Sequence, residues 1–208
     1  MERRTGELWA KQDQHEGDRW RLFRAVGGVV DAERVLYPGS YVDVAPSFVF
    51  GAVTYVDVDR RAARFFADEA GVREIVAAHA GSPTGPQIRF VHADYTSDLG
   101  LERPGFDLLV SLYGGFISER CTEHLRPGGT LLVNPSHGDA AMASIDPRYE
   151  LSGVVEARSG GYRVRTGDLD AFLVPKKPVD LTPELLHGLG RGIAYTKPAF
   201  GYLFTRVA

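Results

Sequence analysis

Two apolar runs in the middle of the chain constrain its fold more than any other feature. The first covers residues 106–111 and the second covers residues 130–133, directly after a Pro127-Gly128-Gly129 turn. Neither run alternates apolar with polar residues, as a strand with one solvated face would. Strands buried on both faces are typical of a parallel sheet that is flanked by helices. We therefore expect an α/β fold whose ligands bind outside the carboxyl ends of the strands.

Segments on both sides of these runs alternate between strand and helix patterns. Strands are predicted at 34–37, 53–58 and 87–92, and helices at 60–70, 72–80 and 114–125. Residues 5–28 fit one or two helices. Residues 149–158 and 162–166 fit a hairpin, and residues 200–207 fit a closing strand. The pattern predicts a doubly wound, mostly parallel seven-stranded sheet with an antiparallel C-terminal strand and hairpin.

Composition favours a single domain that binds small molecules. A chain of 208 residues with 44% apolar residues fills one core, so we expect one domain over residues 1–208. The net charge of −3 provides no overall basic character for nucleic acid or an anionic membrane. No segment approaches the roughly 18 apolar residues of a membrane span, and the charged start does not resemble a signal peptide. We expect a cytoplasmic protein, with no oligomer indicated.

Three residues at predicted strand ends are candidates for ligand binding. Gly39 follows the first strand, where a missing Cβ allows close approach of a ligand. Asp57 ends the second strand, 18 residues later, a spacing at which a carboxylate can accept hydrogen bonds from ribose hydroxyls. Asp94 follows the third strand and can accept a hydrogen bond from an exocyclic amine. The alternative interpretations are a turn glycine for Gly39, a helix cap for Asp57 and a turn cap for Asp94.

Taken in order, these landmarks resemble the class I S-adenosylmethionine-dependent methyltransferase family over roughly residues 34–135. Residues 35–40 (VLYPGS) correspond to the family's first strand and glycine-rich turn. Asp57 corresponds to the acidic residue that holds the cofactor ribose, and the His92-Ala93-Asp94 segment to the position of the adenine contact. Residues 106–112 and the Leu125-Arg126-Pro127-Gly128-Gly129 segment correspond to the fourth strand and the turn into the fifth.

The resemblance implies a Rossmann-like methyltransferase fold, S-adenosylmethionine as cofactor and methyl transfer to a small-molecule acceptor. It divides the domain into an N-terminal helical segment, 1–33, a cofactor-binding core, 34–135, and a C-terminal part, 136–208, that covers the acceptor and closes the sheet. The cofactor-binding residues that it implies are Gly39, Ser40, Tyr41, Asp57, Val58 and Asp94.

The first turn departs from the family pattern because it is poor in glycine. Tyr41 and Asp43 occupy positions where the family has further glycines. Either the loop follows another course and one of these side chains contacts cofactor or substrate, or the chain is a catalytically inactive module with a ligand-binding or regulatory role. The absence of a G-x-G-x-x-G segment at this turn argues against a dinucleotide-dependent dehydrogenase.

Candidates for the acceptor side follow the fourth and fifth strands. Tyr113 lies after the fourth strand and His137 after the fifth, where His137 could deprotonate an acceptor. Direct methyl displacement requires chiefly alignment and desolvation, so neither role is obligatory. The alternatives are a packing aromatic and a solvent-facing or capping histidine. No histidine or cysteine spacing predicts a metal site. Four cations in the C-terminal part would favour an acidic acceptor, or they form only a solvated loop face. These cations are Lys176, Lys177, Arg191 and Lys197.

Overall fold

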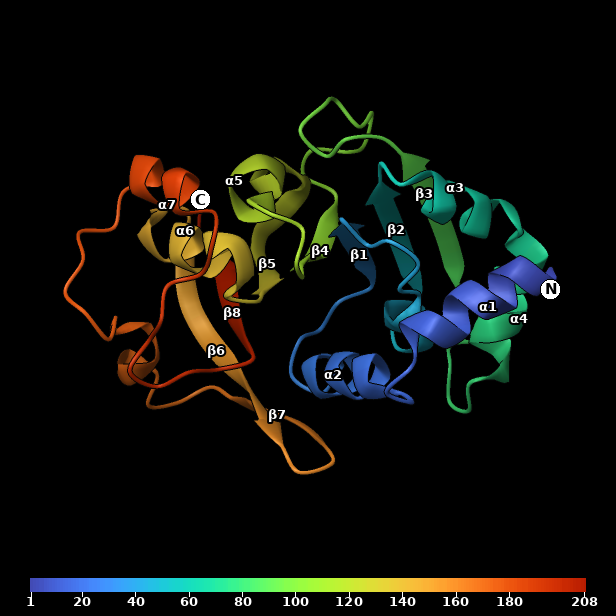
Figure 1. Cartoon of the computed structure of the whole chain (residues 1–208), viewed down its shortest axis with the longest axis horizontal. Helices are drawn as coiled ribbons and strands as arrows, with labels where there is room; N and C mark the ends of the chain where they lie inside the picture. Colours follow the sequence, from blue (N-terminus) through green and yellow to red (C-terminus); the bar gives the residue numbers. More distant parts are fainter.

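The computed structural model describes residues 1–208, and a mixed eight-stranded sheet forms its centre. The spatial order of the strands is β3-β2-β1-β4-β5-β8-β6-β7 (Figure 1). The strands are β1 Arg34–Pro38, β2 Ala52–Asp57, β3 Gln87–His92, β4 Phe106–Ser111, β5 Leu125–Val133, β6 Tyr149–Arg158, β7 Gly161–Arg165 and β8 Gly201–Arg206.

Strand directions confirm the predicted fold class. Strands β1 to β5 run parallel, β8 is antiparallel to both β5 and β6, and β7 is antiparallel to β6. The sheet has eight strands where seven were predicted, because both strands of the hairpin pair within it. The connections from β1 and β4 lead to opposite sides of the sheet, which places a switch point between these two strands.

Helices cover both faces of the sheet. They are α1 Arg3–Gln12, α2 Asp18–Gly27, α3 Arg60–Ala67, α4 Glu69–Ala78, α5 Ile117–Cys121, α6 Asp139–Ile145 and α7 Pro183–Leu189. Short 3₁₀ turns are η1 Ala45–Phe48, η2 Thr122–His124, η3 Ser136–Gly138 and η4 Asp170–Leu173. None of the α-helices is both long and apolar enough to cross a bilayer.

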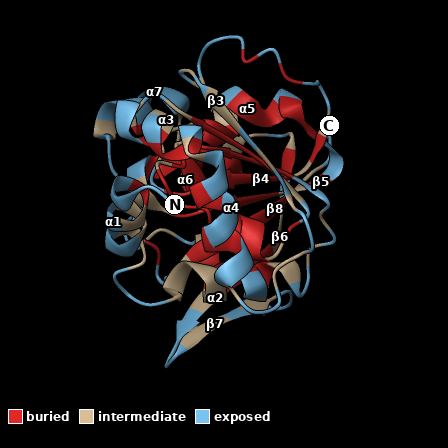
Figure 2. Cartoon of the chain, turned by 90° about the vertical axis from the view of Figure 1, so that its right-hand side faces the viewer, coloured by how far each residue is buried: buried red, intermediate tan, exposed pale blue.

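Alternate residues of strands β1 to β6 and of β8 belong to two separate cores. Val35 and Tyr37 pack with α2, η1, α3 and α4, whereas Leu36 packs with α5, α6 and η4 on the other face. The central strands are buried and the helices expose their outer sides, as Figure 2 shows. This arrangement explains why the strands lack a polar alternation: both of their faces are covered.

Two predicted helices have other boundaries in the structure. Asp68 interrupts the predicted helix 60–70, because its carboxylate accepts a hydrogen bond of 2.9 Å from the Gly71 backbone and starts α4. Gly71 therefore lies inside α4 instead of ending α3. The predicted helix 114–125 is reduced to α5 and η2, since Gly115 has a φ of 93° and Leu125 already pairs with Phe106 in the sheet.

Candidate functional site

The loops after β1 and β4 touch at the switch point of the sheet. Gly39 has a φ of 65°, and a Cβ at this position would lie 3.1 Å from the Gly114 Cα. The two backbones therefore approach so closely that a side chain at Gly39 would crowd the loop after β4. The positive φ and the close approach to Gly114 thus support the interpretation of Gly39 as a turn glycine. The neighbouring Ser40 is buried.

Asp57 lies at the carboxyl end of β2 and holds the loop after β1. Its Oδ2 accepts a hydrogen bond of 2.7 Å from the Tyr41 backbone N–H, and its Oδ1 accepts one of 2.7 Å from the Asp59 backbone N–H. An ionised carboxylate offers about four acceptor positions. Two of these remain for a ligand that carries neighbouring hydroxyl groups.

Asp43 and Tyr41 show how the loop folds without further glycines. Asp43 is 1% exposed and turns inward, where its Oδ2 accepts a hydrogen bond of 2.8 Å from Arg19 Nε. Tyr37 donates a second hydrogen bond, of 3.2 Å, to the same oxygen. Tyr41 adopts a φ of 49°, and its ring lies 5.2 Å from the Arg61 guanidinium carbon. Of the two residues expected to contact a ligand if the loop follows another course, Asp43 therefore has its carboxylate in a buried ion pair with Arg19.

Arg19 was not predicted as part of this region. It reaches from α2 to Asp43, donates a hydrogen bond of 2.9 Å to the Tyr37 hydroxyl, and lies 5.8 Å from the Tyr113 ring centre. Burial opposes the positive charge, yet Tyr37 and Asp43 together raise the pKa of Arg19. The only signal in the sequence is an arginine in an amphipathic helix, which resembles any surface arginine.

Val58 and Asp94 lie at the same edge of the sheet but differ in what they offer. Val58 is 60% exposed, so an apolar side chain stands free beside Asp57. Asp94 is exposed, and its Oδ1 accepts hydrogen bonds of 2.8 Å from both the backbone N–H and the hydroxyl of Thr96. These bonds lower the pKa of Asp94. Asp94 therefore caps the turn after β3, with its second carboxylate oxygen left for a donor.

Asn134 connects the two candidate acceptor-side residues. Its side-chain oxygen accepts hydrogen bonds from the Tyr113 backbone at 3.3 Å and from the Ser136 hydroxyl at 2.7 Å. Ser136 in turn lies 3.2 Å from His137 Nδ1. Tyr113 is 56% exposed, and both Tyr113 and His137 have positive φ values, of 64° and 58°. Both side chains therefore project from strained loops toward solvent instead of packing in the core.

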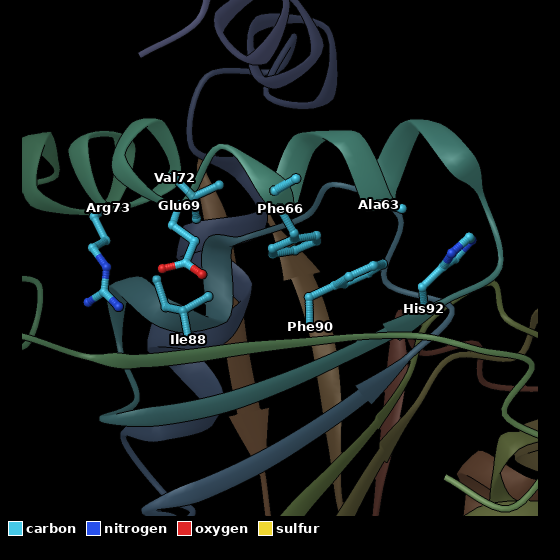
Figure 3. A pocket seen from close by; sticks show the side chains of 9 residues that line it. Ala63, Phe66, Glu69, Val72, Arg73, Ile88, Phe90 and His92 are labelled. Carbon is cyan, nitrogen blue, oxygen red and sulfur yellow. The ribbon is translucent and has the colours of Figure 1, made fainter.

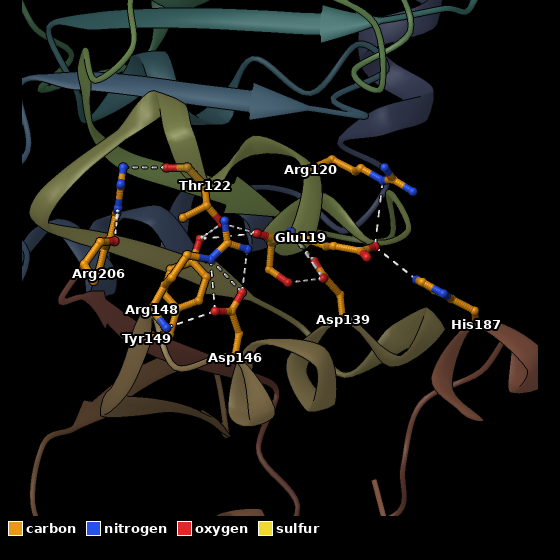
Figure 4. Close-up of polar contacts among 11 residues, drawn as sticks. Glu119, Arg120, Thr122, Asp139, Asp146, Arg148, Tyr149, His187 and Arg206 are labelled. Carbon is orange, nitrogen blue, oxygen red and sulfur yellow. Dashed lines mark hydrogen bonds and ion pairs between the residues drawn. The ribbon is translucent and has the colours of Figure 1, made fainter. Parts of the chain in front are cut away.

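Asp139 is a buried carboxylate behind the loop after β4. It begins α6 and lies within the network of polar contacts in Figure 4. Its carboxylate accepts hydrogen bonds from the hydroxyls of Ser111 and Ser118 and from the Ser118 backbone. Burial raises the pKa of Asp139 to about 6, and the hydrogen bonds from the two serines act in the opposite direction. The cluster fixes the end of β4 to α5 and α6. The sequence indicated only that Asp139 follows a strand.

A cavity lies against the edge strand β3, and its lining ends at His92, which pairs with Asp57 in the sheet and whose Nε2 lies 3.0 Å from the Val58 carbonyl oxygen. It is lined by side chains from α3, α4 and β3, among them Phe66, Phe90, Arg73 and His92 (Figure 3). The Phe66 and Phe90 rings stack at 4.5 Å. None of the five main cavities is lined by Asp57 or Gly39. The candidate site is therefore a set of strand-end loops and not one of these cavities.

Comparison with known proteins identifies the fold. No protein-family model and no curated protein matches the sequence. A protein from Klebsiella pneumoniae, provisionally described as an O-methyltransferase, matches 100% of this chain and 91% of its own, with a TM-score of 0.54 and 10% identity. The O-methyltransferase TomG of Streptomyces achromogenes, solved in complex with SAM, matches over 79% and 87%, with a TM-score of 0.52 and 14% identity.

An rRNA methylase is also among the structures that are similar to this chain. The 16S rRNA methylase RmtB matches 95% of this chain and 65% of its own, with a TM-score of 0.52 and 11% identity. At such identities a structural match demonstrates a common fold. Together with the strand order and the two helical layers, these matches show that the chain has the Rossmann-like fold of class I methyltransferases.

Proposed function

We propose that the protein is an S-adenosylmethionine-dependent methyltransferase that acts on a small-molecule acceptor. The observation that carries this proposal is the Asp57 carboxylate at the tip of β2, which keeps two acceptor positions after binding the Tyr41 and Asp59 backbones. These positions suit the two ribose hydroxyls of the cofactor. The exposed Val58 beside them offers an apolar contact for the adenine ring, and Asp94 has one oxygen available for its amine.

The residues on the acceptor side fit this chemistry. When bound, the cofactor supplies a methyl group on a positively charged sulfur, which an acceptor takes by direct displacement. The Ser136 hydroxyl donates its hydrogen to Asn134, so neutral His137 donates from Nδ1 to Ser136 and keeps Nε2 as an acceptor. His137 is thus prepared to take a proton from a hydroxyl or acid. Tyr113 would cover the acceptor and exclude water.

The domain division follows the same proposal. Residues 34–135 would bind the cofactor, and residues 136–208 would cover the acceptor, behind an N-terminal helical segment of residues 1–33. We also propose a cytoplasmic setting. The alternative, a catalytically inactive module, was motivated by the glycine-poor loop. Because Asp43 turns into the core, one of the two bulky positions no longer competes for the ligand's space.

Calorimetry with S-adenosylmethionine and S-adenosylhomocysteine tests this proposal. Asp57→Ala is expected to weaken binding at least about tenfold, since hydrogen bonds to a charged group contribute roughly 1.5–3 kcal/mol each. Asp59→Asn is the matched control, because Asn also caps helix α3 and the change removes a carboxylate only two residues away. Circular dichroism establishes that both variants fold. If the wild type binds neither compound at millimolar concentration, the proposal fails.

A further inference from the structure

A basic hollow lies in the C-terminal part of the molecule. It has a volume of about 370 Å³, and three of its lining residues are the cations Lys176, Lys177 and Arg191. Its apolar wall includes Val179, Leu189 and Ile193. The size falls within the range of small-molecule sites. Residues 15 positions apart in the sequence therefore join in one concave, positively charged surface.

Backbone pairing between two loop segments brings these cations together. The Lys176 N–H donates a hydrogen bond of 2.8 Å to the Ala194 carbonyl, and the Thr196 N–H donates one of 2.8 Å to the Val174 carbonyl. Pro175 and Tyr195 form the isolated antiparallel bridge between the two bonds. The hollow is thus framed by a short two-stranded ladder. The ladder holds the backbone of Lys176 beside the segment that follows Arg191.

No acidic side chain compensates the charge of the hollow. No aspartate or glutamate is among its lining residues, and Lys176, Lys177 and Arg191 form no ion pair elsewhere. Three like charges that share a concave surface repel one another and attract an anion.

The hollow adjoins the loop after β5. Gly192 packs on this loop so tightly that a Cβ would lie 1.9 Å from the Pro135 carbonyl oxygen. A Cβ at Gly138 would likewise lie 3.3 Å from the Arg191 carbonyl oxygen. His137 lies between these two contacts in the chain. A ligand anchored in the hollow would therefore extend toward the acceptor side of the candidate site.

We propose that this hollow binds a phosphate group that belongs to the methyl acceptor. Three cations suit a phosphate, which carries up to two charges and three acceptor oxygens, better than a single carboxylate. Val179 is 38% exposed and offers apolar contact to the remainder of the ligand. The assignment to the acceptor rests on the proposed methyltransferase function, whereas phosphate binding itself does not. The phosphate would belong to a small metabolite, as the proposed small-molecule acceptor requires, and an RNA backbone is the other source that the test distinguishes.

Calorimetry on the full chain, without cofactor, tests the site with two probes. Inorganic pyrophosphate represents a small phosphate ligand, and a single-stranded oligoribonucleotide represents a nucleic acid. The triple variant Lys176→Gln, Lys177→Gln and Arg191→Gln removes the charge of the hollow. The matched control, Lys11→Gln, Arg60→Gln and Arg89→Gln, removes the same charge from exposed side chains on α1, α3 and β3 that line neither this hollow nor the other cavities described above. Arg191→Gln alone is the second variant if the triple does not fold.

Pyrophosphate binding is expected to weaken at least about tenfold in the hollow variant and to change less than about threefold in the control. The same pattern with the oligoribonucleotide, in the absence of pyrophosphate binding, would support the phosphate site and assign it to nucleic acid. Equal losses in both variants, or no binding of either probe, would overturn the proposal. Because no cofactor is present, that failure is separate from a failure to bind S-adenosylmethionine.

Discussion

The backbone N–H of Tyr41 donates a 2.7 Å hydrogen bond to the side chain of Asp57, which ties the loop after β1 to the tip of β2. In this position Tyr41 has a φ of 49°, a backbone conformation that costs of order 1–3 kcal/mol in a residue with a side chain. A hydrogen bond to a charged acceptor contributes about 1.5–3 kcal/mol and offsets this strain. The Asp57 carboxylate, and not a second glycine, thus stabilises the conformation of this loop.

Tyr41→Gly is predicted to leave cofactor binding nearly unchanged. The variant keeps the backbone donor to Asp57 and removes the strain of the positive φ, while it loses the ring contact with Arg61. Calorimetry should give an affinity for S-adenosylhomocysteine within about threefold of the wild type. A loss as large as that of Asp57→Ala would show that the phenol ring itself contacts the ligand.

The buried pair of Arg19 and Asp43 is predicted to be strongly coupled. Their side chains are 15% and 1% exposed, so removing one partner leaves the other charge buried without compensation. Asp43→Ala should therefore lower the free energy of unfolding by about 3–5 kcal/mol, and Arg19→Met by a similar amount. Urea unfolding of the double variant should show a loss clearly smaller than the sum of the two single losses. Additive losses would mean that the two charges do not interact.

Much of the fold could be predicted from the sequence, because its signals are local or periodic. The unbroken apolar runs of β4 and β5 indicated burial on both faces, and a Ser-Gly-Gly turn indicated the hairpin of β6 and β7. The break between α3 and α4 could not be predicted. It depends on whether the Asp68 side chain turns back to the Gly71 backbone, and the same carboxylate also accepts a hydrogen bond from Glu2, 66 residues away.

Less of the candidate site than of the fold could be predicted from the sequence, since the contacts of the site join segments that lie far apart in the chain. The order of Gly39, Asp57 and Asp94 along the chain indicated three strand ends, and the structure places all three at the same edge of the sheet. Arg19 and Asp139 left no comparable signal. Arg19 reaches Asp43 over 24 residues, and Asp139 reaches Ser111 over 28 residues, so only the folded chain shows that these groups are partners.

Stability is predicted to depend on pH through Asp139. The pKa of this carboxyl is raised from 3.8 to about 6, so between these values the native state holds a proton that the unfolded chain has released. Its contribution to the free energy of unfolding is therefore present below pH 3.8 and is lost as pH rises through 6, by about 3 kcal/mol in total. Asp139→Asn, which cannot ionise, should gain stability relative to the wild type between pH 4.5 and 7.5.

Urea unfolding at these two pH values measures the effect, and Asp59→Asn provides the control. Hydrogen bonds from Arg61 lower the pKa of Asp59 to about 2, so this carboxyl is ionised in both states across the same interval. The difference between Asp59→Asn and the wild type should thus be equal at pH 4.5 and 7.5. If Asp139→Asn behaved in the same way, the buried carboxyl would not be the titrating group.

Gly39→Ala is predicted to combine backbone strain with crowding, and Gly81→Ala separates the two. Both glycines have a positive φ, of 65° and 88°, but a Cβ at Gly81 would have no neighbour within 4 Å. Gly81→Ala should therefore cost only about 1 kcal/mol, the strain of a left-handed alanine. At Gly39 the new Cβ lies 3.1 Å from the Gly114 Cα, so the loop after β4 must shift, and urea unfolding should show a larger loss of stability than in Gly81→Ala.

Binding of S-adenosylhomocysteine should weaken in Gly39→Ala and not in Gly81→Ala, because only the first change displaces the loops that form the candidate site. Equal effects of both variants would mean that the close approach of Gly39 and Gly114 is not needed for binding.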